Sequence, residues 1–341
     1  MSKSSPVMVR PSAEPVLVPG KTAATQVVQL SSPWKKGLSR ALAHYHTIAG
    51  RLADDEEDGV LLHVACTGEG VPFVAASAGC ALHDHGLLHA PFSTSLLDDL
   101  AVYYPAPEGC RSTDPMLLMQ VTEFSCGGFT VGVTWNHTLA DATGMAQFLQ
   151  AVGELTRAEA DASSVPSVTP VRDGRAVSLP LLSPPVVAAK QWLMLDLGGQ
   201  SLVYLDIIAP LKLIDRIKSD YKPGYCTTFE ATAAVLWRCR TRAIIGDDPD
   251  GYDMSTPAPL AFTVNVRKHV GVAAGYYGNC AVAQLAFATT GEVAGAGAGD
   301  EGMNGLVDLI KRAKGGVPEL LRGMTAGGGA VDGMGEEDDG Q

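Results

Sequence analysis

Val131-Gly-Val-Thr-Trp-Asn-His137-Thr-Leu-Ala-Asp141-Ala-Thr-Gly144 is an apolar strand that delivers a histidine into a short turn. An amphipathic helix follows the turn at once, with Met145, Phe148 and Val152 among the residues of its apolar stripe. A histidine at the end of a rigid strand is well placed to act as a general base, because the scaffold fixes its reach. The stretch therefore predicts a strand, a turn and a helix, with a candidate site at the strand end.

Composition limits the classes of protein to which this chain can belong. Its 341 residues suit two domains, and a hydrophobic content of 46% with 18% charged residues allows large buried cores. The formal net charge of −12 argues against nucleic acid or an anionic membrane as the main partner. We find neither the apolar segment of a signal peptide nor an apolar run long enough to cross a bilayer. These features predict a soluble, cytoplasmic protein.

Cysteine and histidine spacing gives no sign of a metal site. The seven cysteines are scattered without a C-x-x-C pair, which predicts reduced, buried thiols. His83, Asp84, His85 and His89 form a cluster, but its spacing matches none of the common metal-ligand patterns, so a solvated loop is the preferred interpretation. Neither a P-loop nor a G-x-G-x-x-G fingerprint is present.

Hydrophobic periodicity and turn residues predict the remaining elements. Helices are expected at residues 38–45, 145–155, 211–217 and 228–244, and strands at 59–65, 116–122, 129–135, 202–208, 260–266 and 280–287. Thr227-Thr-Phe-Glu230 is a capping-box signature for the helix that follows it. The predicted domains are residues 1–157 and 191–325, joined by a linker at 158–190 and followed by a disordered acidic, Gly-rich tail at 326–341.

Each candidate residue also has an ordinary structural interpretation. His137 can cap its strand, and Asp141 can cap the helix that it precedes as readily as orient the histidine. Arg267, at the end of a strand, can pair with a buried carboxylate or lie in solvent beside Lys268. The ordinary interpretation of Gly275-Tyr-Tyr-Gly-Asn279 is a loop packed on the surface.

Five segments in order resemble the plant BAHD acyltransferases, which move acyl groups from coenzyme A thioesters to alcohols or amines. The first is Leu42-Ala-His-Tyr-His-Thr-Ile-Ala-Gly-Arg-Leu52, with Thr47 where proline is common, and the second is His137-Thr-Leu-Ala-Asp141, with Ala142 at the usual glycine position. The others are Thr228-Phe-Glu-Ala-Thr-Ala-Ala-Val-Leu-Trp-Arg238, Asn265-Val-Arg267 and Gly275-Tyr-Tyr-Gly-Asn-Cys280. The family's second signature, D-F-G-W-G, is absent, and the chain ends instead in a Gly-rich acidic stretch.

The resemblance implies an α/β (α+β) fold of the two-domain chloramphenicol acetyltransferase type, with mixed sheets and flanking helices. Because family members are longer, it also implies a truncated second domain. Strands that usually lie between Trp34 and the first helix are missing as well.

A site and a reaction follow from the same resemblance. His137 is the implied general base, Asp141 and Arg267 form the implied structural pair beside it, and Thr227 and Thr228 are candidate contacts for coenzyme A. Acyl-CoA is the implied co-substrate, with no permanently bound cofactor and no metal. The donor is expected to be of hydroxycinnamoyl, benzoyl, acetyl or malonyl type, the acceptor a small alcohol or amine of plant specialised metabolism, and the protein a monomer.

Two other functions compete with this one. A truncated, catalytically inactive homologue would act at most as a ligand- or partner-binding fragment. A carrier-protein-dependent condensation domain shares the H-x-x-x-D logic but usually carries paired histidines, and here Asn136 precedes His137.

Overall fold

The computed structural model forms two compact units, one built mainly from the first half of the chain and one mainly from the second. Residues 272–279 belong to the first unit, although they follow most of the second unit in sequence. The structure describes residues 2–3, 7–9, 33–54, 62–84, 98–105, 109–158, 165–172, 207–246, 252–295 and 300–327.

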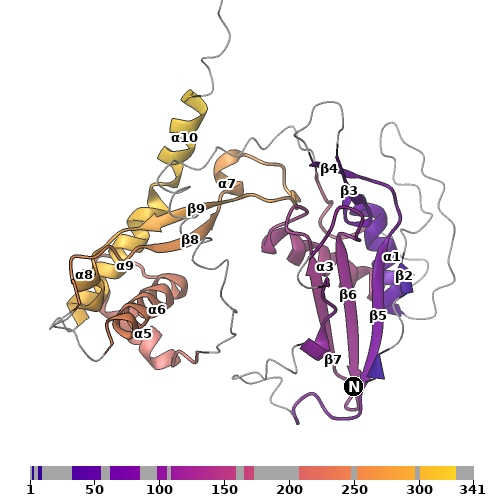
Figure 1. Ribbon diagram of the computed structural model, residues 1–341, viewed down its shortest axis with the longest axis horizontal. Helices are drawn as coiled ribbons and strands as arrows, with labels where there is room; N and C mark the ends of the chain where they lie inside the picture. The colour runs from indigo at the N-terminus through magenta and orange to yellow at the C-terminus, as the bar shows by residue number, and fades with distance from the viewer. Residues whose placement is uncertain are drawn as a thin grey trace, which may run out of the picture. The chain divides into compact units, whose positions relative to one another are not determined.

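The first unit is built on a five-stranded mixed sheet (Figure 1). Its longer strands are β5 (Val71–Ala78), β6 (Leu117–Phe124) and β7 (Phe129–Trp135), with β7 at the end of the strand order, and β1 (Ser2–Lys3) and β2 (Val7–Val9) pair with β5. Strand β6 runs parallel to β5 and antiparallel to β7. The strands predicted at 116–122 and 129–135 are therefore confirmed, and they form a hairpin whose second strand leads into the His137 turn.

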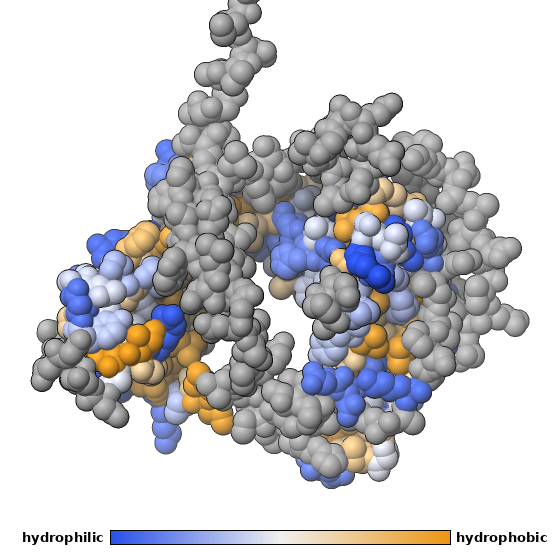
Figure 2. All heavy atoms as spheres, in the orientation of Figure 1, coloured by the Kyte–Doolittle hydropathy of each residue, from blue (hydrophilic) through white to orange (hydrophobic). Residues whose placement is uncertain are grey.

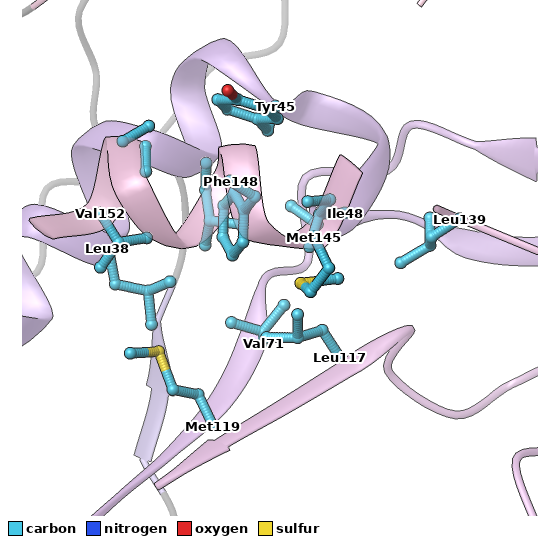
Figure 3. Close-up of a cluster of buried hydrophobic side chains, with 14 of the residues drawn as sticks. Leu38, Tyr45, Ile48, Val71, Leu117, Met119, Leu139, Met145, Phe148 and Val152 are labelled. Carbon is cyan, nitrogen blue, oxygen red and sulfur yellow. The ribbon is translucent and has the colours of Figure 1, made fainter. Parts of the chain in front are cut away.

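Two helices cover this sheet and form the core of the first unit. Helix α1 (Pro33–His44) packs against α3 (Ala142–Arg157), and the predicted stripe of α3 is buried through Met145, Phe148 and Val152. Figure 3 shows these side chains meeting Leu38 and Tyr45 from the first helical region and Leu117 and Met119 from β6. Helix α3 is thus held along its length by apolar contacts.

A short connection leads from α1 to a second, smaller sheet. The one-turn helix η1 (His46–Ala49) follows α1, and β3 (Arg51–Asp54) pairs antiparallel with β4 (Leu62–Ala65). Residues 62–65, the described part of the strand predicted at 59–65, form β4, and β3 begins at Arg51.

The second unit packs helices against a two-stranded antiparallel sheet (Figure 1). The predicted helices and strands are confirmed as α5 (Leu211–Asp220), α6 (Thr228–Ile245), β8 (Leu260–Asn265) and β9 (Ala281–Ala286). Four further helices are α7 (Arg267–Val270), α8 (Thr290–Ala294), α9 (Asp300–Gly315) and α10 (Val317–Gly327). Trp237 is 2% exposed at the centre of this unit, and its indole N–H donates to the carbonyl of Ala258 at 2.8 Å.

Hydrophobic side chains also reach the surface of the molecule (Figure 2). In the second unit the large exposed apolar residues include Ile208, Leu211, Leu213, Phe229, Leu236, Ile244 and Phe287. Within the described part of the chain, no helix is both long enough and apolar enough to cross a membrane.

Four sequence predictions need correction or lie partly outside the described residues. The thiols are free, but the prediction that they are buried is wrong for three of them. Cys66, Cys126 and Cys239 are exposed to solvent. Residues 207 and 208, the described end of the predicted strand 202–208, are not in a strand. Most of the predicted linker and residues 328–341 of the predicted tail lie outside the described residues, so those boundaries stay predictions.

Candidate functional site

The turn between β7 and α3 is built largely by Asn136. Its backbone carbonyl accepts from the N–H of Leu139 at 3.0 Å, which closes the turn. Its side-chain oxygen accepts from both the N–H of Thr138 at 3.0 Å and the hydroxyl of Thr138 at 2.7 Å. An asparagine side chain that bonds the backbone two residues on is a typical turn former, so the sequence supplies this bend locally.

His137 lies in this turn with an exposed side chain. The residue before it is anchored to the sheet, because the N–H of Asn136 donates to the carbonyl of Met116 at 2.9 Å. The arrangement places an accessible imidazole beside the end of the β6–β7 hairpin, which is a suitable position for a base that must meet a dissolved substrate.

Asp141 caps helix α3. Its Oδ1 accepts from the N–H of Gly144 at 2.9 Å, and the residue is 9% exposed. The indole N–H of Trp135 donates to the carbonyl of Ala140 at 2.9 Å and fixes the residue before the cap. The capping interpretation is therefore confirmed.

Arg267 opens helix α7 of the second unit, directly after β8. Its backbone N–H donates to the side-chain oxygen of Asn265 at 3.0 Å. An ion pair with Asp141 would join the two units, so this pair stays a prediction.

Tyr277 corrects the expectation that Gly275–Asn279 is a loop packed on the surface. The residue is 1% exposed and belongs to the core of the first unit. Its hydroxyl lies 2.8 Å from Oγ1 of Thr47, and its ring centroid lies 4.8 Å from that of Tyr45. Burial raises the pKa of Tyr277 to about 12. The ring of Tyr277 therefore anchors this segment in the apolar core of the first unit. The turn-forming residues around it did not indicate this burial in the sequence.

The backbone of the same segment is fixed by several partners. The side-chain amide of Gln147 and the N–H of Val171 each donate to the carbonyl of Gly275 at 2.9 Å, and the N–H of Tyr277 donates to the carbonyl of Val171 at 3.2 Å. Gly144, in the first turn of α3, allows the closest approach, since a Cβ at this position would lie 1.9 Å from the carbonyl oxygen of Tyr277. Any side chain at residue 144 would displace the segment.

Two side chains from distant parts of the sequence donate to the carbonyls of the His137 turn. The amide nitrogen of Asn279 lies 2.7 Å from the carbonyl oxygen of His137 and 3.4 Å from that of Thr138. The guanidinium of Arg172 donates to the carbonyls of Leu139 and Thr138. Sequence reasoning missed both residues, because Arg172 falls in the expected linker and nothing local links either residue to the turn.

Thr227 and Thr228 begin helix α6 in the second unit. Oγ1 of Thr227 accepts from the N–H of Glu230 at 3.2 Å, and the Glu230 carboxylate accepts from the N–H of Thr227 at 2.9 Å, which confirms the capping box. Oγ1 of Thr228 accepts from Nζ of Lys218 at 3.3 Å. These contacts give both hydroxyls a role at the helix start, and their role toward coenzyme A stays a prediction.

The histidine cluster was set aside as a metal site on spacing alone. Nε2 of His83 lies 3.5 Å from Oδ1 of Asp84, with both side chains exposed, while His85 and His89 lie outside the described residues. Among the side chains that the structure describes, no group of three or more histidine, cysteine, aspartate or glutamate residues is arranged to hold a metal ion.

Comparison with known proteins places these features in one family. Residues 19–301 match the Transferase family. Acyl transferase 15 of Oryza sativa subsp. japonica is 37% identical over 94% of this chain and 76% of its own length. A myricetin 3-O-glucosyl 1,2-rhamnoside 6'-O-caffeoyltransferase of Crocosmia x crocosmiiflora is 32% identical over 82% of this chain and 64% of its own length.

Solved structures give the same fold. Vinorine synthase matches 97% of this chain and 81% of its own, with a TM-score of 0.63 at 19% identity. The F. sporotrichioides TRI101 structure, complexed with coenzyme A and T-2, matches 86% of this chain and 69% of its own, with a TM-score of 0.50 at 18% identity. The predicted fold class, a mixed α/β architecture of the chloramphenicol acetyltransferase type, is confirmed.

The chain spans 76% of the length of the rice relative named above and between 55% and 68% of four other rice acyl transferases. The family match over most of the chain and the 37% identity to a plant acyl transferase together show which family this chain belongs to. The chain belongs to the BAHD acyltransferases of the Transferase family.

Proposed function

We propose that this protein transfers an acyl group from a coenzyme A thioester to a hydroxyl group of a small plant metabolite, with His137 as the general base. One observation carries the proposal: in a chain that belongs to this family, the histidine of an H-x-x-x-D motif is exposed just after the end of a strand. The caffeoyltransferase and benzyl alcohol O-benzoyltransferase among the relatives favour an aromatic acyl donor, of hydroxycinnamoyl or benzoyl type. An amine acceptor would use the same chemistry.

The proposed reaction needs one proton carrier. Neutral imidazole accepts the acceptor's hydroxyl proton as the oxygen attacks the thioester carbonyl, which forms a tetrahedral intermediate. Collapse of this intermediate breaks the C–S bond, and the imidazolium returns the proton to the departing coenzyme A thiolate. The products are the acylated acceptor and free coenzyme A, and the histidine ends in its starting state.

The remaining site residues have supporting roles in this proposal. Asp141, already the cap of α3, pairs with Arg267 and shapes the turn instead of relaying a proton. Thr227 and Thr228 lie at the N-terminus of an 18-residue helix, where backbone N–H groups favour a negatively charged group such as a coenzyme A phosphate.

Thiol release is the direct test of the proposed function. A panel of acyl-CoA donors is offered with alcohol and amine acceptors, and free thiol is measured for the wild type, His137→Ala and a control, His83→Ala. His83 is an exposed histidine of the same unit, so its loss should leave activity unchanged. Loss of the base should lower turnover by about 100- to 10,000-fold. Normal turnover by a folded His137→Ala protein would contradict the assignment.

A catalytically inactive homologue is the second candidate, favoured by the shorter coverage of several relatives. This alternative predicts a cooperative thermal melt and binding of acyl-CoA without thiol release from any donor. Thiol release by the wild-type protein would exclude this alternative.

A further inference from the structure

We infer that Arg172 and Asn279 are positioning residues for the proposed base: together they hold the three consecutive carbonyls of the His137 turn and so set the direction of the imidazole. This inference rests on the proposed function of His137. Neither residue belongs to the H-x-x-x-D motif, and they reach the turn from 34 and 142 positions away in sequence. We call Arg172 and Asn279 the carbonyl clamp.

The turn needs such donors because of its backbone geometry. The carbonyls of His137, Thr138 and Leu139 all meet nitrogen donors of the carbonyl clamp. Carbonyl dipoles that converge on one region repel each other unless N–H groups lie between them. A guanidinium with several N–H groups can serve two carbonyls at once, and a side-chain amide serves the third at 2.7 Å.

The clamp is itself supported by the docked segment 272–279. The guanidinium carbon of Arg172 lies 5.6 Å from the ring centroid of the buried Tyr277, a cation–π arrangement. Gly278 leaves room for this arrangement, since a Cβ at this position would lie 2.4 Å from Nη1 of Arg172 and 2.3 Å from the hydroxyl of Tyr276. The segment therefore supplies one donor directly and the aromatic support for the other.

Holding the carbonyl of His137 constrains its Cα and the direction of its side chain. The base must lie within hydrogen-bond reach of the acceptor proton in the reacting complex. A misplacement of about 1 Å can cost on the order of 100-fold in rate, even when the change is made outside the reacting groups. The clamp should accordingly affect kcat more than the KM for acyl-CoA.

Two clamp variants and two controls test the inference. Asn279→Asp replaces the donating amide by an acceptor of the same shape, and Arg172→Met removes the donors but keeps the length of the chain. Asn304→Asp is the first control, because the amide of Asn304 donates to the carbonyl of Asp220 at 3.3 Å in the other unit. Arg157→Met removes an exposed arginine of the first unit.

Amide hydrogen exchange measures the turn without any need for activity. Both clamp variants should raise exchange of the Thr138 and Leu139 amides by about tenfold or more, while the rest of the first unit keeps its protection. kcat should fall by about 10- to 100-fold and the KM for acyl-CoA should stay within about twofold. Arg172→Lys should recover part of the loss, since a lysine carries fewer and less directed donors.

Two outcomes would contradict the inference, and a third would contradict the proposed function alone. Unchanged exchange in the turn of a folded clamp variant overturns the inference. Raised exchange with a kcat no lower than in the two controls shows that the clamp stabilises the turn without positioning the base, and so overturns it too. If the wild type releases no thiol, the proposed function fails, and the exchange data alone still decide whether the clamp holds the turn.

Discussion

The starts of helices α3 and α6 are both capped by a residue that bonds a backbone N–H three positions on, but they differ in the distant groups that support them. Helix α6 begins with a complete capping box within Thr227–Glu230, so its two key hydrogen bonds join residues three apart. Helix α3 begins with Asp141 as cap, but the turn before it depends on Arg172 and Asn279. Both helix caps are thus local, but each helix start also has distant partners. Lys311 and Lys314 support the capping box of α6, and Arg172 and Asn279 hold the turn that carries the proposed base.

The largest effect on stability and turnover is expected from adding a side chain at Gly144. Gly144→Ala would place a methyl group 1.9 Å from the carbonyl oxygen of Tyr277 and should expel the docked segment. Overpacking against backbone should cost about 3 kcal/mol in the free energy of unfolding, and turnover should fall with the loss of Asn279 from the turn. Urea unfolding and thiol release measure the two effects.

Gly153 offers a matched control in the same helix. A Cβ there meets only the flexible side chain of Arg157, at 3.5 Å. Gly153→Ala should therefore raise helix stability by up to about 1 kcal/mol and leave turnover unchanged. Equal effects of the two substitutions would show that docking of the segment against α3 is unimportant.

The next effect concerns the capping box of helix α6 and depends on pH. The Glu230 side chain is 4% exposed, and its carboxylate lies 2.7 Å from Nζ of Lys314 and 3.5 Å from Nζ of Lys311. Burial opposes ionisation of Glu230, but the hydrogen bonds from Lys314 and from the Thr227 backbone outweigh it and lower its pKa to about 2. In an unfolded chain the carboxyl group titrates near a pKa of about 4.3.

Because the pKa of Glu230 is lower in the folded state, its stabilisation is complete above the unfolded value and is lost as the pH falls toward 2. Glu230→Gln should cost about 2 kcal/mol in unfolding free energy at pH 7, and the difference from wild type should shrink between about pH 4.5 and 2. Glu292→Gln changes the exposed capping box of α8 and should have a smaller effect. A pH-independent difference for Glu230→Gln would contradict the assignment of the lowered pKa to this carboxyl.

The smallest effect on the free energy of unfolding is expected from the proposed ion pair of Asp141 and Arg267. Asp141→Asn keeps a capping side chain but removes the charge, and Arg267→Met removes the guanidinium. If the pair forms, the double mutant should show a coupling energy of about 1 kcal/mol in unfolding free energy. Simple additivity of the two single substitutions would reject the pair, and Asp141 would then serve as a cap alone.

Local signals predicted most of the regular elements correctly. The alternating strand that ends at Trp135, the stripe of α3 and the capping box at Thr227 each depend on residues a few positions apart, so their physics is visible in the sequence. Tyr277 was misjudged for the opposite reason. Its neighbours are glycines and polar residues typical of a turn, and its burial depends on a core supplied by residues more than a hundred positions earlier.

The sequence by itself determined the family, the capping box of α6 and the position of His137 at the end of a strand. It did so because motifs, periodicity and capping depend on short spacings. Only the tertiary structure decided which groups hold the turn that presents His137. Arg172 and Asn279 acquire their role when segment 272–279 docks into the core of the first unit, and hydrogen bonds across 33 to 142 residues leave no periodic or local trace in the chain.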